Sequence, residues 1–298
     1  MTEDWALHSG DCIPHMMEDM DPESVDFAVF SPPFPSLYAY TDSHSDIGNV
    51  DTMGHEASLH ISFMFRGLQR VLKPGRAAVV HVCQIPRMKR SGGTGLADFR
   101  GTIIRIGERA GLTYEYDWSV RKNPQAQAIR TRSRELQFAG LENDRAATRG
   151  TLQDYLIKFR NAGENAVKIN SPHQVSRNDW IKWAEGCWDD IIETDTLNTK
   201  AAKSPDDTKH ICPLQLEVIR RCVLLFSNPG ELVFSPFAGI GSEGYVSIGG
   251  ISPKTHKSVA DPRRFYGVEL KNEYYNAAIA NLSSAIKSRE SALQKALF

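Results

Sequence analysis

The stretch VDFAVFSPPF, residues 25–34, joins an apolar run to a pair of prolines. The run has the length and composition of a buried β-strand. A proline pair often does no more than end such a strand. Here, however, the prolines fix φ, have no backbone N–H, and leave free carbonyl groups beside an aromatic ring at the carboxyl end of the strand. This arrangement predicts a cradle for a flat ligand that bears an amino group.

A second strand-and-loop pattern lies near the carboxyl end of the sequence. ELVF, residues 231–234, is typical of a short buried strand and runs into SPFAGIGSEG, residues 235–244. Glycines at these spacings let the backbone turn tightly from a strand into a helix and approach a ligand closely. The loop is therefore predicted to hold a nucleotide-like cofactor.

The combination of SPPF first and the glycine loop last resembles the DNA amino-methyltransferases, in the circularly permuted order called the β class. The resemblance implies methyl transfer from S-adenosyl-L-methionine to the exocyclic nitrogen of cytosine (N4) or adenine (N6) in double-stranded DNA. It also implies an α/β fold: a Rossmann-like S-adenosylmethionine-dependent methyltransferase sheet with an inserted target-recognition region. Both ends of the chain match the family pattern, and the middle does not.

The resemblance also assigns residues to roles. The implied catalytic residues are Ser31, Pro32, Pro33 and Phe34. The implied cofactor-binding residues are Asp11, Cys12, His210, Ser235, Pro236, Phe237, Ala238, Gly239, Gly241, Ser242 and Glu269. Glu269 ends a predicted strand over 264–270, where a carboxylate can accept both ribose hydroxyls. Ser235 stands where the family usually has Asp, and a hydroxyl cannot offer the same charge-assisted contact to the cofactor's ammonium group.

The reaction itself dictates what the catalytic residues must do. A paired base is buried in the duplex, so it must be flipped out before its amino group can react. We expect Phe34 to stack on the flipped ring, while the Ser31 hydroxyl and the Pro32 carbonyl accept hydrogen bonds from the amino group. Positioning that nitrogen close to the reactive methyl supplies much of the rate. No covalent intermediate is needed, the amine proton can leave to solvent, and Cys83 is expected to be a core residue.

The loop over 38–49 has the length and polarity of a segment that closes over a flipped base. Its His44 and Asp46 could be a general acid and base, although a solvated turn explains them equally well.

Three alternatives remain at this stage. Ser at the first motif position leans toward cytosine in this family, so N4-cytosine is favoured over N6-adenine. The pattern GIGSEG with Glu269 downstream also satisfies the dinucleotide fingerprint of a nicotinamide-dependent dehydrogenase, but that fingerprint normally opens its domain. Ser235 leaves room for a DNA-binding protein of this fold that has lost catalysis. The recognition sequence, and any part in a restriction-modification system, cannot be read from these motifs.

Composition agrees with an enzyme of this kind. The 298 residues are 41% hydrophobic, which is enough for a sizeable core. No apolar run is long enough to span a membrane, and residues 1–9 lack the features of a signal peptide. The five cysteines form no C-x-x-C pair, which favours reduced thiols in the cytoplasm and argues against a metal site. A homodimer is left open.

The formal net charge is −1, but the basic residues are unevenly placed. None precedes Arg66, whereas they outnumber acidic residues between Arg87 and Arg134. Such clustering is what phosphate contact requires, although a solvated basic surface without a partner is about as frequent. The candidate DNA-contacting residues are Arg87, Lys89, Arg90, Arg121, Lys122, Arg130, Arg132 and Arg134.

These patterns divide the chain into three parts. Residues 1–85 are expected to form the catalytic half of the methyltransferase domain, and residues 205–298 the cofactor-binding half. Residues 86–204 are expected to be a target-recognition region that also supplies core strands over 113–120 and 152–159. Three tryptophans at 180, 183 and 188 favour the packing of a small helical insert over base stacking.

Overall fold

The computed structural model describes residues 4–34, 46–47, 55–87, 95–131, 138–198 and 213–296. Its centre is an eight-stranded sheet with the order β1-β10-β9-β2-β3-β7-β6-β8. The strands are β1 (Trp5–Ser9), β2 (Phe27–Phe30), β3 (Ala77–Cys83), β6 (Thr113–Val120), β7 (Asp154–Arg160), β8 (Cys187–Trp188), β9 (Leu232–Ser235) and β10 (Arg264–Glu269). A separate two-stranded ribbon consists of β4 (Ile85–Pro86) and β5 (Leu96–Ala97).

Neighbouring strands of the sheet are parallel, except that β7 runs antiparallel to both β3 and β6. The strands predicted over 113–120 and 152–159 are therefore both present, and both belong to the central sheet. The fold predicted from the sequence, a Rossmann-like methyltransferase sheet, is confirmed. The boundaries proposed at residues 85 and 204 stay predictions.

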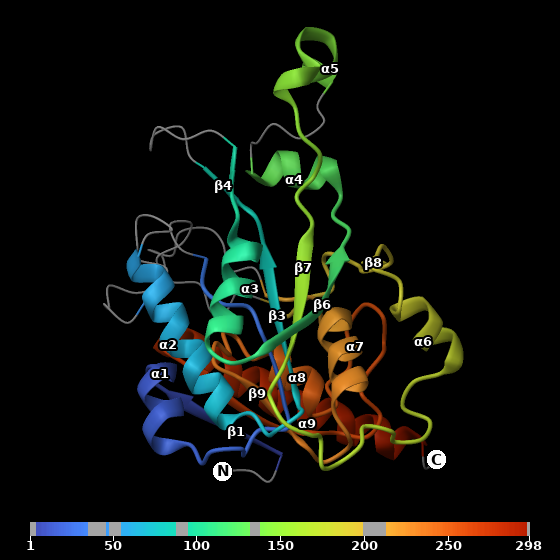
Figure 1. Ribbon diagram of the computed structural model, residues 1–298. Coiled ribbons are helices and arrows are strands. Elements are labelled where there is room, and N and C mark those ends of the chain that lie inside the picture. The colour runs from blue at the N-terminus through green and yellow to red at the C-terminus, as the bar shows by residue number, and fades with distance from the viewer. Residues whose placement is uncertain are drawn as a thin grey trace.

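Helices cover both faces of the sheet (Figure 1). One face carries the short α1 (Cys12–Pro14), which continues into a π-helical turn (His15–Asp19), together with α2 (His55–Val71) and α3 (Phe99–Arg109). The other face carries α7 (Leu216–Phe226), α8 (Ser242–Ser247) and α9 (Asn272–Ala296). The remaining helices are α4 (Pro124–Thr131), α5 (Phe138–Asn143), a 3-10 turn (Arg145–Ala147) and α6 (Arg177–Trp183).

The strand β2 shows why the sheet is buried on both sides. All four of its side chains are inaccessible to solvent. Because successive strand residues point to opposite faces, Phe27 and Val29 pack in the core with α7, α8 and α9, whereas Ala28 and Phe30 pack with α2 and α3. A continuous apolar run is what a parallel strand between two helical layers requires.

Asp26 links the amino ends of the two central strands. Its carboxylate accepts a hydrogen bond from the backbone N–H of Leu232 at 2.9 Å and pairs with Lys73 Nζ at 2.6 Å. The Arg76 guanidinium lies 3.5 Å from Asp26 and also pairs with Glu231. Each buried charge in this group therefore has a partner, as buried charges need.

The tryptophans behave as the sequence predicted in two cases out of three. Trp183 and Trp188 are buried in the core cluster with α7, and the Arg221 guanidinium lies over both rings at 5.5 Å and 5.0 Å. Trp180 is 62% exposed on α6. In the part of the chain that the structure describes, no helix is long and apolar enough to cross a membrane, and no group of three acidic, His or Cys side chains could hold a metal ion.

The turn between α2 and β3 gives a test of the fold. Gly75 has φ +69°, and a Cβ there would lie 2.3 Å from the backbone N of Asn165. Gly230 has a similar φ of +74°, but a Cβ there would meet no heavy atom within 4 Å. Gly230→Ala should therefore cost only the left-handed backbone strain, about 1–2 kcal/mol. Gly75→Ala should lower the free energy of unfolding by clearly more, as measured by urea denaturation. Equal losses would show that the clash at Gly75 is relieved without cost.

Candidate functional site

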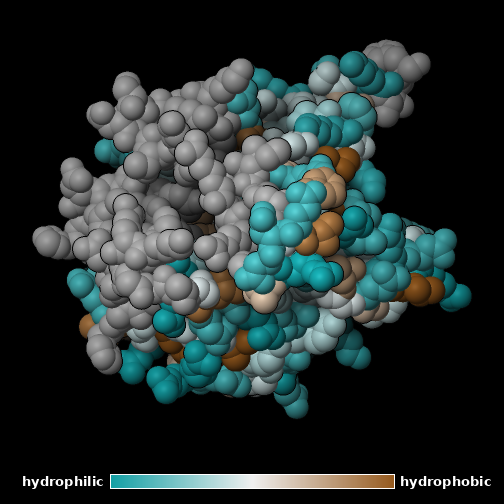
Figure 2. All heavy atoms as spheres, turned by 90° about the horizontal axis from the view of Figure 1, so that it is seen from above, coloured by the Kyte–Doolittle hydropathy of each residue, from teal (hydrophilic) through white to brown (hydrophobic). Residues whose placement is uncertain are grey.

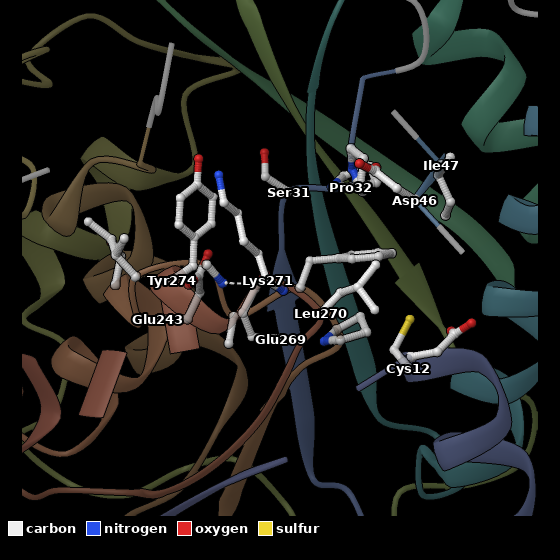
Figure 3. Close-up of a pocket in the computed structure, with 18 of the residues that line it drawn as sticks. Cys12, Ser31, Pro32, Asp46, Ile47, Glu243, Glu269, Leu270, Lys271 and Tyr274 are labelled. Carbon is white, nitrogen blue, oxygen red and sulfur yellow. Dashed lines mark hydrogen bonds between the residues drawn. The ribbon is translucent and has the colours of Figure 1, made fainter. Parts of the chain in front are cut away.

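A cavity opens at the carboxyl ends of four adjacent parallel strands, β1, β10, β9 and β2 (Figure 3). Its wall consists of residues 10–13 after β1, 31–34 after β2, residues 236–240, 242 and 243 after β9, and residues 269–271 and 274 after β10. Residues 46, 47, 213 and 214 complete it. Ligands of open α/β sheets bind at this edge. The two motifs that are farthest apart in the sequence thus form one site.

Two glycines shape the loop after β9 in different ways. Gly239, with φ +52°, lies in the cavity wall, and a Cβ there would point into open space. Gly241, with φ +84°, lies behind the wall, where a Cβ would be 3.1 Å from that of Ala278 on α9. The first glycine leaves room for a ligand against the backbone, and the second lets the loop pack closely on α9.

The Glu269 carboxylate is held by the backbone at the end of β10. It accepts hydrogen bonds from the N–H of Gly239 at 2.7 Å and of Lys271 at 2.9 Å. Burial raises the pKa of Glu269 to about 7, against the opposing effect of these two donors. The side chain is therefore fixed in position while its oxygens line the cavity.

The turn after β1, which carries Cys12 into the cavity wall (Figure 3), is capped by Asp11. The Asp11 carboxylate accepts a hydrogen bond from the backbone N–H of Ile13 at 2.9 Å and so begins α1. Cys12 follows, and burial raises the pKa of its thiol far above the ordinary value. A thiol that stays protonated is a packing surface and not a nucleophile.

The SPPF motif lines the cavity with all four of its residues. Ser31 Oγ lies 2.5 Å from Nδ1 of His81 on β3, and it also donates to the His81 carbonyl at 3.2 Å. The Phe34 ring packs against Phe99, with ring centroids 5.5 Å apart. The hydroxyl and the ring that the sequence assigned to the base pocket are therefore both held in place by neighbouring elements.

Most of the predicted cofactor residues lie in the wall: Asp11, Cys12, Pro236, Phe237, Ala238, Gly239, Ser242 and Glu269. Ser235 and Gly241 do not. Ser235 is fully buried as the last residue of β9, and its hydroxyl has no hydrogen-bond partner among the described residues. Its expected contact with the cofactor stays a prediction. His210 and His44 lie outside the described residues, and Cys83 is only half-buried instead of being in the core.

Four polar residues of the wall have no firm role predicted from the sequence. Glu243 opens α8 directly after the glycine loop, while Lys271 and Tyr274 follow Glu269 at the start of α9. Lys271 Nζ lies 4.7 Å from the centre of the Tyr274 ring. Asp46, which the sequence left open, is buried in the wall. Glu243, Lys271 and Tyr274 could have been predicted from the sequence, because they lie close to the glycine loop or to Glu269 along the chain.

The donors and acceptors of the wall fit a nucleoside with a charged tail. Ser242 Oγ is buried in the wall without a hydrogen-bond partner among the described residues. An orphaned buried hydroxyl is costly unless a ligand or water satisfies it. The carboxylates of Asp46, Glu243 and Glu269 can accept from hydroxyl or ammonium groups, and apolar side chains such as Ile13 and Phe237 can pack on a flat ring. The residues present therefore fit the cofactor that the motifs predict.

The candidate DNA-contacting residues differ in their exposure to solvent. Arg87 and Arg121 are exposed. Lys122 is 6% exposed and pairs with Asp154, so its charge is not available on the surface, which corrects its assignment. The side chains of Arg130, Lys89, Arg90, Arg132 and Arg134 are outside the described set. The helices α4 and α5 stand beyond the carboxyl ends of β3 and β6 (Figure 1), and the described surface seen from that side is largely hydrophilic (Figure 2).

The acidic wall predicts a pH dependence of stability. Burial, followed by the charge of Glu269, raises the pKa of Glu243 to about 8 from an ordinary 4.5, and that of Glu269 rises to about 7. The folded protein thus holds protons that the unfolded chain has released, so the free energy of unfolding falls as pH rises from about 4.5 to 8. Glu269→Gln should remove about 3–4 kcal/mol of this fall.

Urea denaturation at several pH values, without ligand, measures this effect. Glu243→Gln should act in the same direction, whereas exposed Glu273→Gln on α9 should leave the slope unchanged. A wild-type slope that survives Glu269→Gln would show that Glu269 is ionised in the folded protein.

Comparisons with known proteins agree with this geometry. Residues 25–280 match the sequence profile of the N6_N4_Mtase family, described as DNA methylase. Short segments match two curated proteins. One is the DNA adenine methyltransferase YhdJ of Escherichia coli (strain K12), 34% identical over 68 residues, which are 23% of this chain and 19% of that protein. The other is the type II methyltransferase M.Cfr9I of Citrobacter freundii, 31% identical over 86 residues, which are 29% and 24%.

The matched segments thus span only a fifth to a quarter of those relatives, but likeness to solved structures extends over nearly the whole chain. TTHA0409 of Thermus thermophilus, described as a candidate DNA modification methylase and solved with S-adenosyl-L-methionine, superposes with a TM-score of 0.66. It is 20% identical, over 94% of this chain and 93% of that one. The cytosine-N4-specific PvuII DNA methyltransferase also gives 0.66, at 18% identity over 94% and 87%.

At these identities the structural matches show a shared fold. The family profile spans most of the chain, including both motifs that meet in the cavity. The resemblance seen in the sequence is thereby confirmed, and the chain belongs to the N6/N4 DNA methylase family.

Proposed function

We propose that this protein transfers a methyl group from S-adenosyl-L-methionine to the exocyclic amino group of a flipped base in double-stranded DNA. The observation that carries the proposal is the meeting of SPPF with the glycine loop and Glu269 in one cavity. When bound, the cofactor would supply an electrophilic methyl group. Glu269 would accept from its ribose hydroxyls, and the buried Ser242 hydroxyl would gain the partner that it lacks.

For the target base, we propose cytosine N4, with adenine N6 as the second candidate. The Ser at position 31 favours cytosine as a family tendency, and the fold matches a cytosine-N4-specific enzyme. One of the two curated matches, however, is a DNA adenine methyltransferase. The two bases present the same pattern of amino group and ring nitrogen, so one cradle suits either with small changes.

The sequence also left two other functions open, a dehydrogenase and a catalytically inactive DNA-binding protein. Family membership argues against the dehydrogenase, because its only support was a glycine pattern that the methylase profile now covers. The catalytically inactive DNA-binding protein depended on Ser235, a buried residue outside the cavity wall, and it stays a second candidate that the methylation assay tests. A homodimer, a cytoplasmic location and a place in a restriction-modification system stay predictions.

The direct test is to incubate the protein with unmethylated genomic DNA and S-adenosyl-L-methionine, and then to analyse the nucleosides by mass spectrometry. We expect N4-methylcytosine. Detection of N6-methyladenine would support the same methyl-transfer reaction with adenine, instead of cytosine, as the target base. If neither appears while the cofactor still binds in calorimetry, the protein is an inactive DNA binder or acts on a different nucleic-acid substrate.

Phe34 provides a sharper test of the base pocket. Phe34→Ala should remove base stacking worth about 1–3 kcal/mol, which corresponds to roughly a 5- to 150-fold loss of turnover. Affinity for the cofactor, measured by calorimetry, should stay nearly unchanged. Phe63→Ala, at an exposed position of α2, is the matched control. Loss of cofactor affinity in Phe34→Ala would contradict the assignment of Phe34 to the base pocket.

The surface charges give a third test. Arg87→Gln and Arg121→Gln should each reduce the slope of log affinity for DNA against log salt by about 1, since each removes one phosphate contact. Arg177→Gln on the exposed side of α6 should leave the slope unchanged. Fluorescence anisotropy with a duplex at several salt concentrations measures it. Identical slopes in all four proteins would place the DNA on another surface.

A further inference from the structure

Behind the SPPF motif, four polar side chains form a line that runs from the cavity wall into the protein. Ser31 Oγ lies 2.5 Å from His81 Nδ1, His81 Nε2 lies 2.9 Å from Asp154 Oδ2, and Lys122 Nζ lies 2.5 Å from the same oxygen. The side chains of His81, Asp154 and Lys122 are 13%, 12% and 5% exposed. They come from three segments: β3, β7 and the chain just after β6.

Charge decides which nitrogen of His81 carries the proton. Burial opposes the ionisation of Asp154, but its cationic neighbours, an imidazolium at His81 and the ammonium of Lys122, outweigh burial and lower the pKa of this carboxyl to about 2; Lys122 supplies its charge whatever the state of His81. An ionised carboxylate can only accept, so Nε2 of the ring must be the protonated nitrogen that faces Asp154. The contact is close but poorly aligned for a hydrogen bond, and is mainly electrostatic. In the neutral ring, Nδ1 then has a free lone pair, and it points at Ser31.

The Ser31 hydroxyl is oriented by this arrangement. Its single proton has two acceptors, both on His81: Nδ1 at 2.5 Å and the backbone carbonyl at 3.2 Å. Donation to His81 leaves the oxygen lone pairs of Ser31 free toward the cavity that it lines. An incoming amino group therefore meets an acceptor, as the proposed reaction requires, and not a competing donor.

We propose that His81 is a positioning residue that orients Ser31 and takes up, through it, the proton that the target amino group loses. The proposal rests on the methyltransferase function above. As the new N–C bond forms, the C–S bond breaks and its electron pair stays on sulfur. The N–H proton passes to Ser31 Oγ, while the original Ser31 proton passes to His81 Nδ1. The resulting imidazolium is stabilised by Asp154 and later releases the proton to solvent.

Lys122 balances the charge of Asp154 beside His81. Without a counter-charge, ionised Asp154 would favour the protonated form of the imidazole, which cannot accept the proton of Ser31. The ammonium of Lys122 lies 2.5 Å from the same carboxylate oxygen that faces His81 and offsets this effect. The charged groups that face the ring, within the described ranges, are thus Asp154 from β7 and Lys122 after β6. This replaces the expectation that the amine proton leaves directly to solvent.

The test is the pH profile of a single-turnover methyl-transfer rate, with cofactor and DNA affinities measured separately. Since only neutral imidazole can accept the proton, the wild-type rate should rise with pH to a plateau. His81→Asn keeps a hydrogen-bonding group but cannot take up a proton. It should lower the plateau about 100-fold, the smaller end of general-base effects, and abolish the acid limb. Both affinities should change less than about threefold.

Lys122→Met supplies a readout that a structural role would not give. It should move the acid limb to higher pH, a shift that a purely structural defect would not produce. Asp154→Asn should lower the plateau. His256→Asn, at an exposed loop position, is the matched control and should change nothing. An acid limb that persists in His81→Asn would overturn the proposal.

A second measurement does not depend on catalysis or on stable variants. Nitrogen-15 NMR of the wild-type protein, without cofactor or DNA and with the His81 signals assigned, should show His81 with Nδ1 as the unprotonated acceptor and Nε2 protonated at neutral pH. The opposite tautomer would overturn the proposal even if the enzyme is active. Wild-type protein that shows the expected tautomer but methylates no DNA would instead refute the proposed function.

Discussion

The parallel pairing of β2 with β9 is the constraint on which the site depends. Phe27 lies opposite Val233, and Ala28 opposite Phe234. Both strands end at the same edge of the sheet, so the two motifs meet there although most of the sequence separates them. At the other end, Asp26 fixes the register by accepting from Leu232 N–H while pairing with Lys73. A shift of one residue would turn each apolar side chain to the wrong layer.

The acidic groups divide into two kinds with opposite effects on stability. Asp154 and Asp26 are buried with cationic partners, and partnering of this kind compensates their burial. Glu243 and Glu269 are buried in the cavity wall, and burial raises the pKa of both. Perturbed groups of this second kind gather at functional sites, where a ligand supplies the missing partner. In the ligand-free protein, the cost of burying acidic groups is therefore least compensated at the cavity wall. This wall is also where the ligand is expected to bind.

Local patterns predicted the strands and the motif residues, because apolar runs, prolines and glycines act on their own backbone. The line from Ser31 to Lys122 was not predictable in that way. It depends on the antiparallel insertion of β7, which brings Asp154 near His81 on β3 and Lys122 after β6. Ser235 shows the same limit. The motif alone does not indicate that the end of β9 buries this side chain completely.

The position of β1 at the edge of the sheet has a consequence for the order of folding. Among the strands that the structure describes, this strand, near the start of the sequence, pairs with β10 alone, near the end of the sequence. Contacts between such distant segments form late, because the intervening chain must first be ordered. Until then Trp5 and Leu7 lack the neighbours that shield them in the finished protein. The residues at 10–13, which follow β1, are therefore expected to take their place in the cavity wall when the two ends of the chain pair, so that binding of a nucleoside there would report that pairing.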